Sequence, residues 1–235
     1  MMNQDAVARV QGPGEFKGLY GPDNRPLAVT KKQAPVKRAH VIRYFDYPAE
    51  KKLLGLVGSI KGKKAERDRM IMEVGFGLGL RVSELASLTV GHVRLKEQIS
   101  IFGKAEPGGP PKERILPISK HLQRAIKDYI KMKLVWKESI HDDAPLFVSS
   151  SGNRFKKRSL EEMFEKWCLR AGLVAENGKA AYTFHCMRHT CAMRLRERGY
   201  DIEQVASWLG HSSLNSTRVY FRTSMEELVE MAESL

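Results

Sequence analysis

The chain has 235 residues, a formal net charge of +13 at pH 7 and an apolar fraction of 42%, so it is long enough to bury one full hydrophobic core. Such a basic surplus favours a polyanion as the partner, with nucleic acid as the first candidate. The three cysteines are too few and too irregularly placed for a disulfide framework, which indicates a reducing cytoplasm. No apolar run approaches the length of a membrane span, and the N-terminus lacks the apolar core of a signal peptide.

Residues 1–45 differ in composition from the rest of the chain. Glycine and proline recur, no apolar period persists, and the segment holds eight basic and three acidic residues. This composition predicts an extended or partly disordered basic arm. Four of its side chains are candidates for contacts with a DNA backbone: Lys31, Lys32, Lys37 and Arg38. A solvated tail without a partner is the alternative.

Ordered structure is expected from residue 46 to residue 235. Pro48 suits a first helical turn, and the apolar stripe that follows it ends at Gly62. A second helix is predicted over 65–76, and the glycines of 75–79 then interrupt it. Because no strand precedes these glycines and no Lys-Ser/Thr pair follows them, we expect a close backbone crossing rather than a nucleotide-binding loop.

The middle of the chain predicts a short helix over 81–88 and then two strands, Gln98–Phe102 and Arg114–Ile118, joined by a hairpin loop over 103–111. Apolar periodicity predicts further helices in the remaining sequence, over 120–136, 159–171, 184–198, 202–209, 213–222 and 225–234. The predicted fold class is therefore α+β, mainly α-helical, with one small antiparallel sheet.

The residues with the strongest chemical signal lie in the C-terminal quarter. Thr183 is positioned to cap a helix whose first turn carries His185 and Arg188, where free amides and partial positive charge favour an anion. His211 follows the helix-ending Gly210, and Tyr220 is expected two turns along the next helix. His185 and His189 have a metal-ligand spacing, but no third ligand or general-base glutamate accompanies them, so no metal site is expected.

Taken together, several short motifs resemble those of the tyrosine recombinase (phage-integrase-like) family. They are R-V-S-E-L at 81–85, G-K at 103–104, H-x-x-R-H-T at 185–190 and L-G-H-S-S at 209–213, with a tyrosine nine residues after His211. The resemblance covers about residues 46–235 and implies the catalytic fold of that family. It also implies a metal- and ATP-independent enzyme that cleaves and rejoins double-stranded DNA through a 3′-phosphotyrosyl intermediate, without a cofactor.

The resemblance implies a role for each matching residue. Tyr220 is the nucleophile and His185 the acceptor of its proton, since an imidazole titrates near neutral pH and a phenol near pH 10. Lys104 protonates the leaving 5′-oxygen. The non-bridging phosphate oxygens are held by the remaining catalytic side chains, which are Arg81, Arg188 and His211. Glu84 matches the acidic residue that orients its cationic neighbours, with an ordinary surface carboxylate as the alternative.

The chain departs from the family pattern at two places. Seven residues separate Lys104 from Lys112, where relatives carry a compact Gly-Lys-Gly-x-Lys-x-Arg hairpin, so Lys112 is the alternative general acid. Most relatives also carry a helical DNA-clamping domain of about one hundred residues, which the 1–45 arm is too short to form. The chain is therefore either a naturally short recombinase or a fragment.

The C-terminal helix 225–234 begins with capping-box spacing and carries an apolar stripe, so it must dock on a surface, because so short a helix is not stable alone in water. Packing on its own domain is one possibility. The family precedent implies docking on a neighbouring protomer, in a homotetramer on DNA that is weakly associated or monomeric without DNA. A type IB topoisomerase and a non-catalytic DNA-binding regulator are the alternative functions. The expected location is the cytoplasm of a bacterium or archaeon, in association with the nucleoid.

Overall fold

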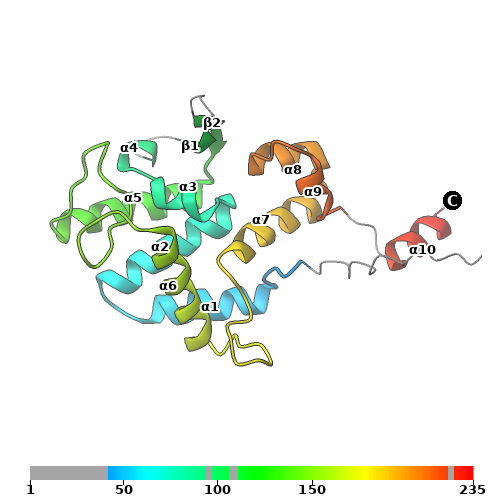
Figure 1. Ribbon diagram of the computed structural model, residues 1–235, viewed down its shortest axis with the longest axis horizontal. Helices are drawn as coiled ribbons and strands as arrows, with labels where there is room; N and C mark the ends of the chain where they lie inside the picture. The colour runs from blue at the N-terminus through cyan, green and yellow to red at the C-terminus, as the bar shows by residue number, and fades with distance from the viewer. Residues whose placement is uncertain (1–41, 94–96, 106–110, 222–224, 235) are drawn as a thin grey trace, which may run out of the picture. The chain divides into compact units, whose positions relative to one another are not determined.

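The computed structural model describes residues 42–93, 97–105, 111–221 and 225–234 (Figure 1). The described residues all belong to one compact unit, residues 41–235. The arm lysines and Arg38 lie outside the described residues. Phe45 belongs to the core, because its ring is 2% exposed and stacks on Tyr182 with 3.9 Å between the ring centroids.

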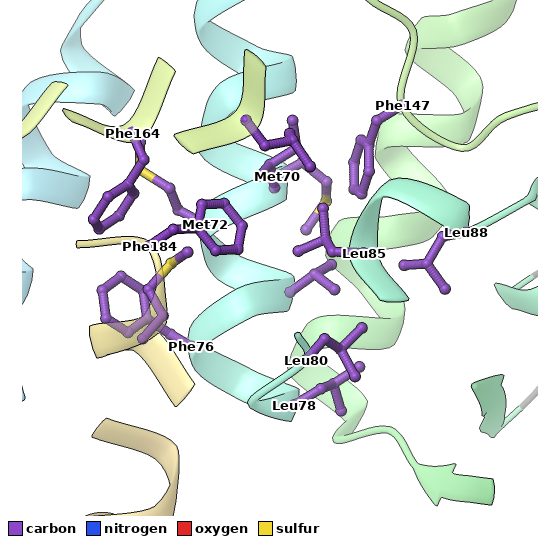
Figure 2. Close-up of a cluster of buried hydrophobic side chains, with 14 of the residues drawn as sticks. Met70, Met72, Phe76, Leu78, Leu80, Leu85, Leu88, Phe147, Phe164 and Phe184 are labelled. Carbon is purple, nitrogen blue, oxygen red and sulfur yellow. The ribbon is translucent and has the colours of Figure 1, made fainter. Parts of the chain in front are cut away.

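Two helices at the start of this unit form the base of the core. Helix α1 (Tyr47–Ser59) is capped by Asp46, whose carboxylate accepts from the Ala49 N–H at 2.8 Å. Helix α2 (Lys63–Leu78) is buried along most of its length, and Figure 2 shows its side chains in the hydrophobic cluster. The labelled members of this cluster are Met70, Met72, Phe76, Leu78, Leu80, Leu85, Leu88, Phe147, Phe164 and Phe184.

The glycines of 75–79 do not end α2 where the sequence analysis expected. The helix continues through Gly75 to Leu78, and Gly79 then ends it in the left-handed conformation with φ of 62°. A Cβ at Gly75 would lie 2.9 Å from the Met187 sulfur, so the missing side chain admits a neighbouring helix. The close neighbour is thus the Met187 side chain rather than the crossing backbone that the sequence had predicted.

The sheet consists of two antiparallel strands, as predicted. Strand β1 (Gln98–Ala105) and strand β2 (Pro111–Pro117) pair from Gln98 with Pro117 to Ala105 with Pro111. Both strands are longer than predicted, so the hairpin loop is shorter. The register shifts between Phe102 and Ala105, where β1 carries an extra residue. Helix α3 (Val82–Ser87) precedes the sheet, and a one-turn helix that the sequence analysis did not predict, α4 (Val90–Val93), follows α3.

Three longer helices complete the core and carry the site. Helices α5 (Lys120–Val135) and α6 (Lys157–Arg170) lie close to the predicted ranges. Helix α7 (His185–Glu197) packs on α2, and Figure 1 shows it leading directly to α8 (Ile202–Leu209) and α9 (Asn215–Arg218). The predicted cap by Thr183 is wrong, because the N-cap residue of α7 is Phe184 and no side chain caps the helix. The Thr183 N–H donates to the Cys186 sulfur.

The segment that carries the tyrosine differs from its prediction. Instead of one helix over 213–222, the structure has the four-residue helix α9, followed by tighter turns in which the Tyr220 N–H donates to the Thr217 carbonyl at 2.9 Å. Tyr220 therefore does not lie two turns along a helix. It packs in a small second core with Ala192, Val205 and Leu209.

The last described element is α10 (Met225–Glu233). Its apolar side chains are largely exposed: Met225 at 70%, Leu228 at 48%, Val229 at 51% and Met231 at 59%. Within the described part of the chain, none of the helices combines the length and apolar character that a membrane crossing requires.

Candidate active site

Arg188 connects the ends of three helices. It is the fourth residue of α7 and only 1% exposed. One terminal nitrogen donates to the Gly79 carbonyl at 2.8 Å and the other to the Leu209 carbonyl at 2.7 Å. Carbonyls at helix ends lack a partner within their own helix, so a guanidinium fork can satisfy two of them at once. This one side chain brings together the turn before Arg81 and the turn that carries His211.

Arg81 reaches the same turn from the other side. Its guanidinium donates to the Gly210 carbonyl at 3.1 Å and to Glu84 Oε1 at 2.8 Å. The Arg81 side chain remains 38% exposed, so it borders solvent while Arg188 lies beneath it. The sequence analysis expected Arg81, Arg188 and His211 to meet, and the structure brings them together around residues 209–211.

Glu84 is the central acceptor of this network. Its carboxylate is 2% exposed and accepts a bidentate pair from Arg114, at 2.7 and 2.9 Å, as well as the N–H and guanidinium of Arg81. Burial alone raises the pKa of the Glu84 carboxyl, but the hydrogen bonds and charges of the two arginines outweigh burial and hold it below its ordinary value. A surface carboxylate, the alternative that the sequence left open, is excluded.

The site carries a surplus of positive charge at neutral pH. Three guanidinium groups, those of Arg81, Arg114 and Arg188, interact with the single carboxylate of Glu84. Burial, together with the charge of Arg81, lowers the pKa of Arg188 to about 10, so Arg188 is still protonated at pH 7. An anion entering this site would relieve the repulsion between the guanidinium groups.

His211 is presented by the turn that ends α8. Gly210 adopts the left-handed conformation with φ of 66°, and the His211 N–H donates to the Ala206 carbonyl at 3.0 Å, which closes the helix. The His211 Nδ1 lies 2.7 Å from the Thr217 hydroxyl. Burial and the charges of Arg188 and Arg81 lower the pKa of His211 to about 4, so its ring is neutral at pH 7.

His185, the first residue of α7, lies near Arg188 and Arg81. His185 is exposed to solvent, but neighbouring atoms still desolvate part of its ring, and this effect together with the charges of Arg188 and Arg81 lowers its pKa. His185 in turn lowers the pKa of His211. Its ring stands perpendicular to that of His189, with 4.5 Å between the centroids. Among the described residues no group of three metal-ligating side chains occurs, and this histidine pair is not part of one.

The Tyr220 hydroxyl is hydrogen-bonded to His189. The distance from His189 Nδ1 to the phenol oxygen is 2.8 Å, and Tyr220 is 3% exposed. Burial raises the pKa of Tyr220, and the charges of Arg188 and Arg81 partly offset this effect. Both arginines are therefore close enough for their charge to act on the phenol.

The two candidate lysines lie at the loop end of the hairpin. Lys104 lies in β1 within the irregular step of the register, and Lys112 is the second residue of β2. Their side chains lie outside what the structure describes, so Lys104 and Lys112 both stay candidates. An extra residue in a strand redirects the neighbouring side chains, so the register shift bears on which amine faces the site.

The sequence analysis missed three contributors to the site. Arg114 was noted only as the start of a strand, although its position after Lys-x in the hairpin motif was a usable signal. His189 was weighed only as a metal ligand, and Thr217 was not singled out. No signal in one sequence shows that Thr217 is buried against His211, because that contact depends on how α9 folds back.

The comparisons with known proteins show the family to which the chain belongs. Residues 49–227 match the model of the phage integrase family. The tyrosine recombinase XerC of Histophilus somni is 34% identical over 166 residues, which cover 70% of this chain and 52% of that protein. XerC of Thermodesulfovibrio yellowstonii is 32% identical over 170 residues, covering 71% of this chain and 53% of the relative. The chain spans about half the length of these relatives.

Solved structures place the fold in the same class. The crystal structure of XerA recombinase superposes with a TM-score of 0.66 at 27% identity, over 90% of this chain and 69% of that one. The XerH site-specific recombinase bound to its difH substrate gives 0.62 at 22% identity, over 91% and 59% of the two chains, and supports the fold alone. The fold is that of a tyrosine recombinase catalytic domain. The chain belongs to the phage integrase family.

Proposed function

We propose that this protein is a site-specific DNA recombinase, which cleaves and rejoins DNA strands through a 3′-phosphotyrosyl intermediate. The observation that carries the proposal is that Arg81, Arg188 and His211 meet at one turn. The charges of the two arginines also act on the Tyr220 phenol. A buried cluster with surplus positive charge beside a potential nucleophile suits attack on a phosphodiester.

The proposed chemistry follows from the charges. A phosphodiester gains negative charge as its phosphorus becomes five-coordinate, and fixed donors aimed at the non-bridging oxygens lower that barrier. The exposed part of Arg81 and the neutral ring of His211 are the proposed donors, and Arg188 supplies buried charge while holding their backbone in place. Glu84 fixes the guanidinium of Arg81 against Arg114.

A lysine of the hairpin is the proposed general acid for the leaving 5′-oxygen, with Lys104 ahead of Lys112. Because one phosphodiester is exchanged for another, the reaction is nearly isoenergetic and requires no ATP, and the side chains provide the charge that a metal supplies elsewhere. The proposed partner is double-stranded DNA. XerH and the Tn1549 transposon integrase, similar to this chain in fold, were solved with DNA. The basic arm (Lys31, Lys32, Lys37 and Arg38) is proposed to track the DNA backbone.

On DNA, the chain is proposed to form a homotetramer in which α10 docks on a neighbouring copy. Helix α10 carries four glutamates besides its exposed apolar residues. A cavity of about 510 Å³ offers a complementary surface, since Phe76, Leu122 and Trp208 line it together with Arg194 and Arg198. The proposed location is the cytoplasm of a bacterium or archaeon, at the nucleoid, where such a DNA substrate is found.

The docking proposal is tested by a charge placed on the apolar face. Leu228→Asp should bind a single DNA half-site with unchanged affinity but lose the assembly of four protomers on paired sites, as seen by native mass spectrometry. Leu134→Asp, which changes a leucine of similar exposure on α5 (54% against 48% for Leu228), is the matched control. Assembly that survives Leu228→Asp would exclude α10 as the docking element.

The catalytic proposal is tested with a nicked suicide duplex that traps the covalent intermediate. The wild-type protein should become attached to the DNA 3′ end, and Tyr220→Phe should bind the duplex equally well without attachment. DNA binding without any adduct would favour a non-catalytic regulator. Relaxation of supercoiled DNA without exchange between two labelled duplexes would favour a type IB topoisomerase.

The general acid is identified by a leaving group that needs no proton. A 5′-phosphorothiolate substrate should restore cleavage to Lys104→Ala, because a thiolate leaves without protonation. Restoration for Lys112→Ala instead would move the role to Lys112.

A further inference from the structure

The histidine in contact with the tyrosine is His189, one residue after Arg188. Its Nδ1 lies 2.8 Å from the Tyr220 hydroxyl, and the two ring centroids are 5.6 Å apart. His189 is half-buried on α7, and Tyr220 is almost fully buried in the small core formed with Ala192, Val205 and Leu209. The phenol oxygen thus lies within hydrogen-bond distance of an imidazole nitrogen.

His185 does not share this contact. Of the two described histidines of α7, only His189 hydrogen-bonds Tyr220. The charges of Arg188 and Arg81 act on His185, so His185 lies near the two guanidinium groups that are proposed to bind phosphate. The two histidines stand one helical turn apart on α7 with 4.5 Å between their ring centroids, and the hydrogen bond to the phenol comes from His189.

We infer that His189, rather than His185, is the catalytic residue that accepts the Tyr220 proton; this inference rests on the proposed strand-transfer function. The neutral tautomer with its proton on Nε2 presents the Nδ1 lone pair to the phenol. As the phenol oxygen bonds to phosphorus, the Tyr220 proton passes to Nδ1 and the bond between phosphorus and the 5′-oxygen breaks. The leaving oxygen takes a proton from the hairpin lysine.

This assignment changes the role of His185. A neutral imidazole beside Arg188 and Arg81 is suited to donate a hydrogen bond to a phosphate oxygen. His185 and His211 are therefore both assigned to binding the phosphate, and only His189 is assigned to accepting the proton of Tyr220. The two histidines should then respond differently to changes in the acidity of the phenol.

The test uses the same substitution at both positions. His189→Asn keeps a polar atom near the Nδ1 position but is too weak a base to accept a proton at neutral pH, and His185→Asn is the matched control. On the nicked suicide duplex, His189→Asn should form the covalent adduct roughly 10²–10⁴-fold more slowly than the wild type. Its affinity for DNA and its melting temperature should stay close to the wild-type values.

Replacing Tyr220 by 3,5-difluorotyrosine then separates the two roles. A more acidic phenol depends less on a base, so the fluorinated nucleophile should recover about tenfold or more of the rate lost in His189→Asn and little of the rate lost in His185→Asn. Recovery confined to His185→Asn would overturn the assignment, as would failure to recover either variant. Cleavage by His189→Asn at or above the wild-type rate would also overturn it.

Failure of the inference is distinguishable from failure of the proposed function. A wild-type protein that forms no adduct overturns both. A wild-type protein that forms the adduct, together with an equally fast His189→Asn, overturns the inference alone.

Discussion

Replacement of Glu84 by glutamine tests whether the buried carboxylate holds the site together. In the wild type, this carboxylate accepts four hydrogen bonds, two from Arg114 and two from Arg81. The amide of glutamine is isosteric, but it has one acceptor oxygen and turns an NH₂ group toward a guanidinium. Two arginines are then left without their shared counter-charge.

The magnitude follows from the exposure of the partners. Breaking a fully buried ion pair by removing one member costs about 3–5 kcal/mol. The side chain of Arg114 is 14% exposed, but that of Arg81 is 38% exposed and can regain water. The low end of that range, about 3 kcal/mol, is therefore expected. For a unit of this size each kcal/mol shifts the melting temperature by roughly 2–4 °C, so Glu84→Gln should melt about 6–12 °C lower.

The assay is denaturant unfolding of the two proteins at pH 7 and at lower pH. Glu162→Gln is the matched control, because Glu162 forms a surface pair with Arg158 and its replacement should change stability little. The pKa of Glu84 is lowered in the folded state, so its contribution is present above its ordinary value of 4.5 and is lost as the pH falls through the folded value. The difference between wild type and Glu84→Gln should therefore shrink as the pH falls below about 4.5.

Two results would refute this reasoning. One is a loss of stability at pH 7 no larger than that of Glu162→Gln, which would mean that solvent replaces the carboxylate at little cost. The other is a difference between wild type and Glu84→Gln that stays constant down to pH 3, which would show that the charge of Glu84 does not stabilise the fold.

Two further predictions concern the stability of the turn at Gly79 and the protonation of the histidines in the site. Gly79→Ala should lower the free energy of denaturant unfolding by about 2–4 kcal/mol, since it forces a side chain into the left-handed region and places a Cβ 3.0 Å from Cys191 and Leu209. The control Gly178→Ala has open space around it, so it should lose only the part of this free energy that comes from the left-handed backbone. Equal losses in the two variants would contradict the packing argument. DNA binding near pH 5.5 should be accompanied by proton uptake. A bound phosphate raises the pKa of His211, which is about 4 without it, and also raises the pKa of His185, which lies below its ordinary value. Calorimetry in two buffers of different ionisation enthalpy measures this uptake, which should disappear in the double variant His211→Gln/His185→Gln; proton release on binding would reverse the assumed sign.

Most of the secondary structure could be predicted from periodicity. The apolar stripes of α1, α5, α6 and α8 are local features, and a helix with one apolar face needs no knowledge of its partner to be recognised. The end of α2 was predicted too early, because glycine disfavours helices on average, whereas Gly75 serves here to admit Met187. The helix over 213–222 was predicted too long, because burial of Tyr220 against α7 and α8 outweighs local preference.

The types of the reactive side chains and their order along the chain follow from the sequence alone: two arginines, several histidines, a tyrosine and a hairpin with two lysines. Side-chain type sets charge and hydrogen-bonding capacity, and these can be read from the residues. Only the tertiary structure decided that Arg188 joins the carbonyls of Gly79 and Leu209, and that His189 rather than His185 meets the phenol. These contacts join residues 21 to 109 positions apart, and the direction of a ring on a helix depends on how that helix packs against its neighbours.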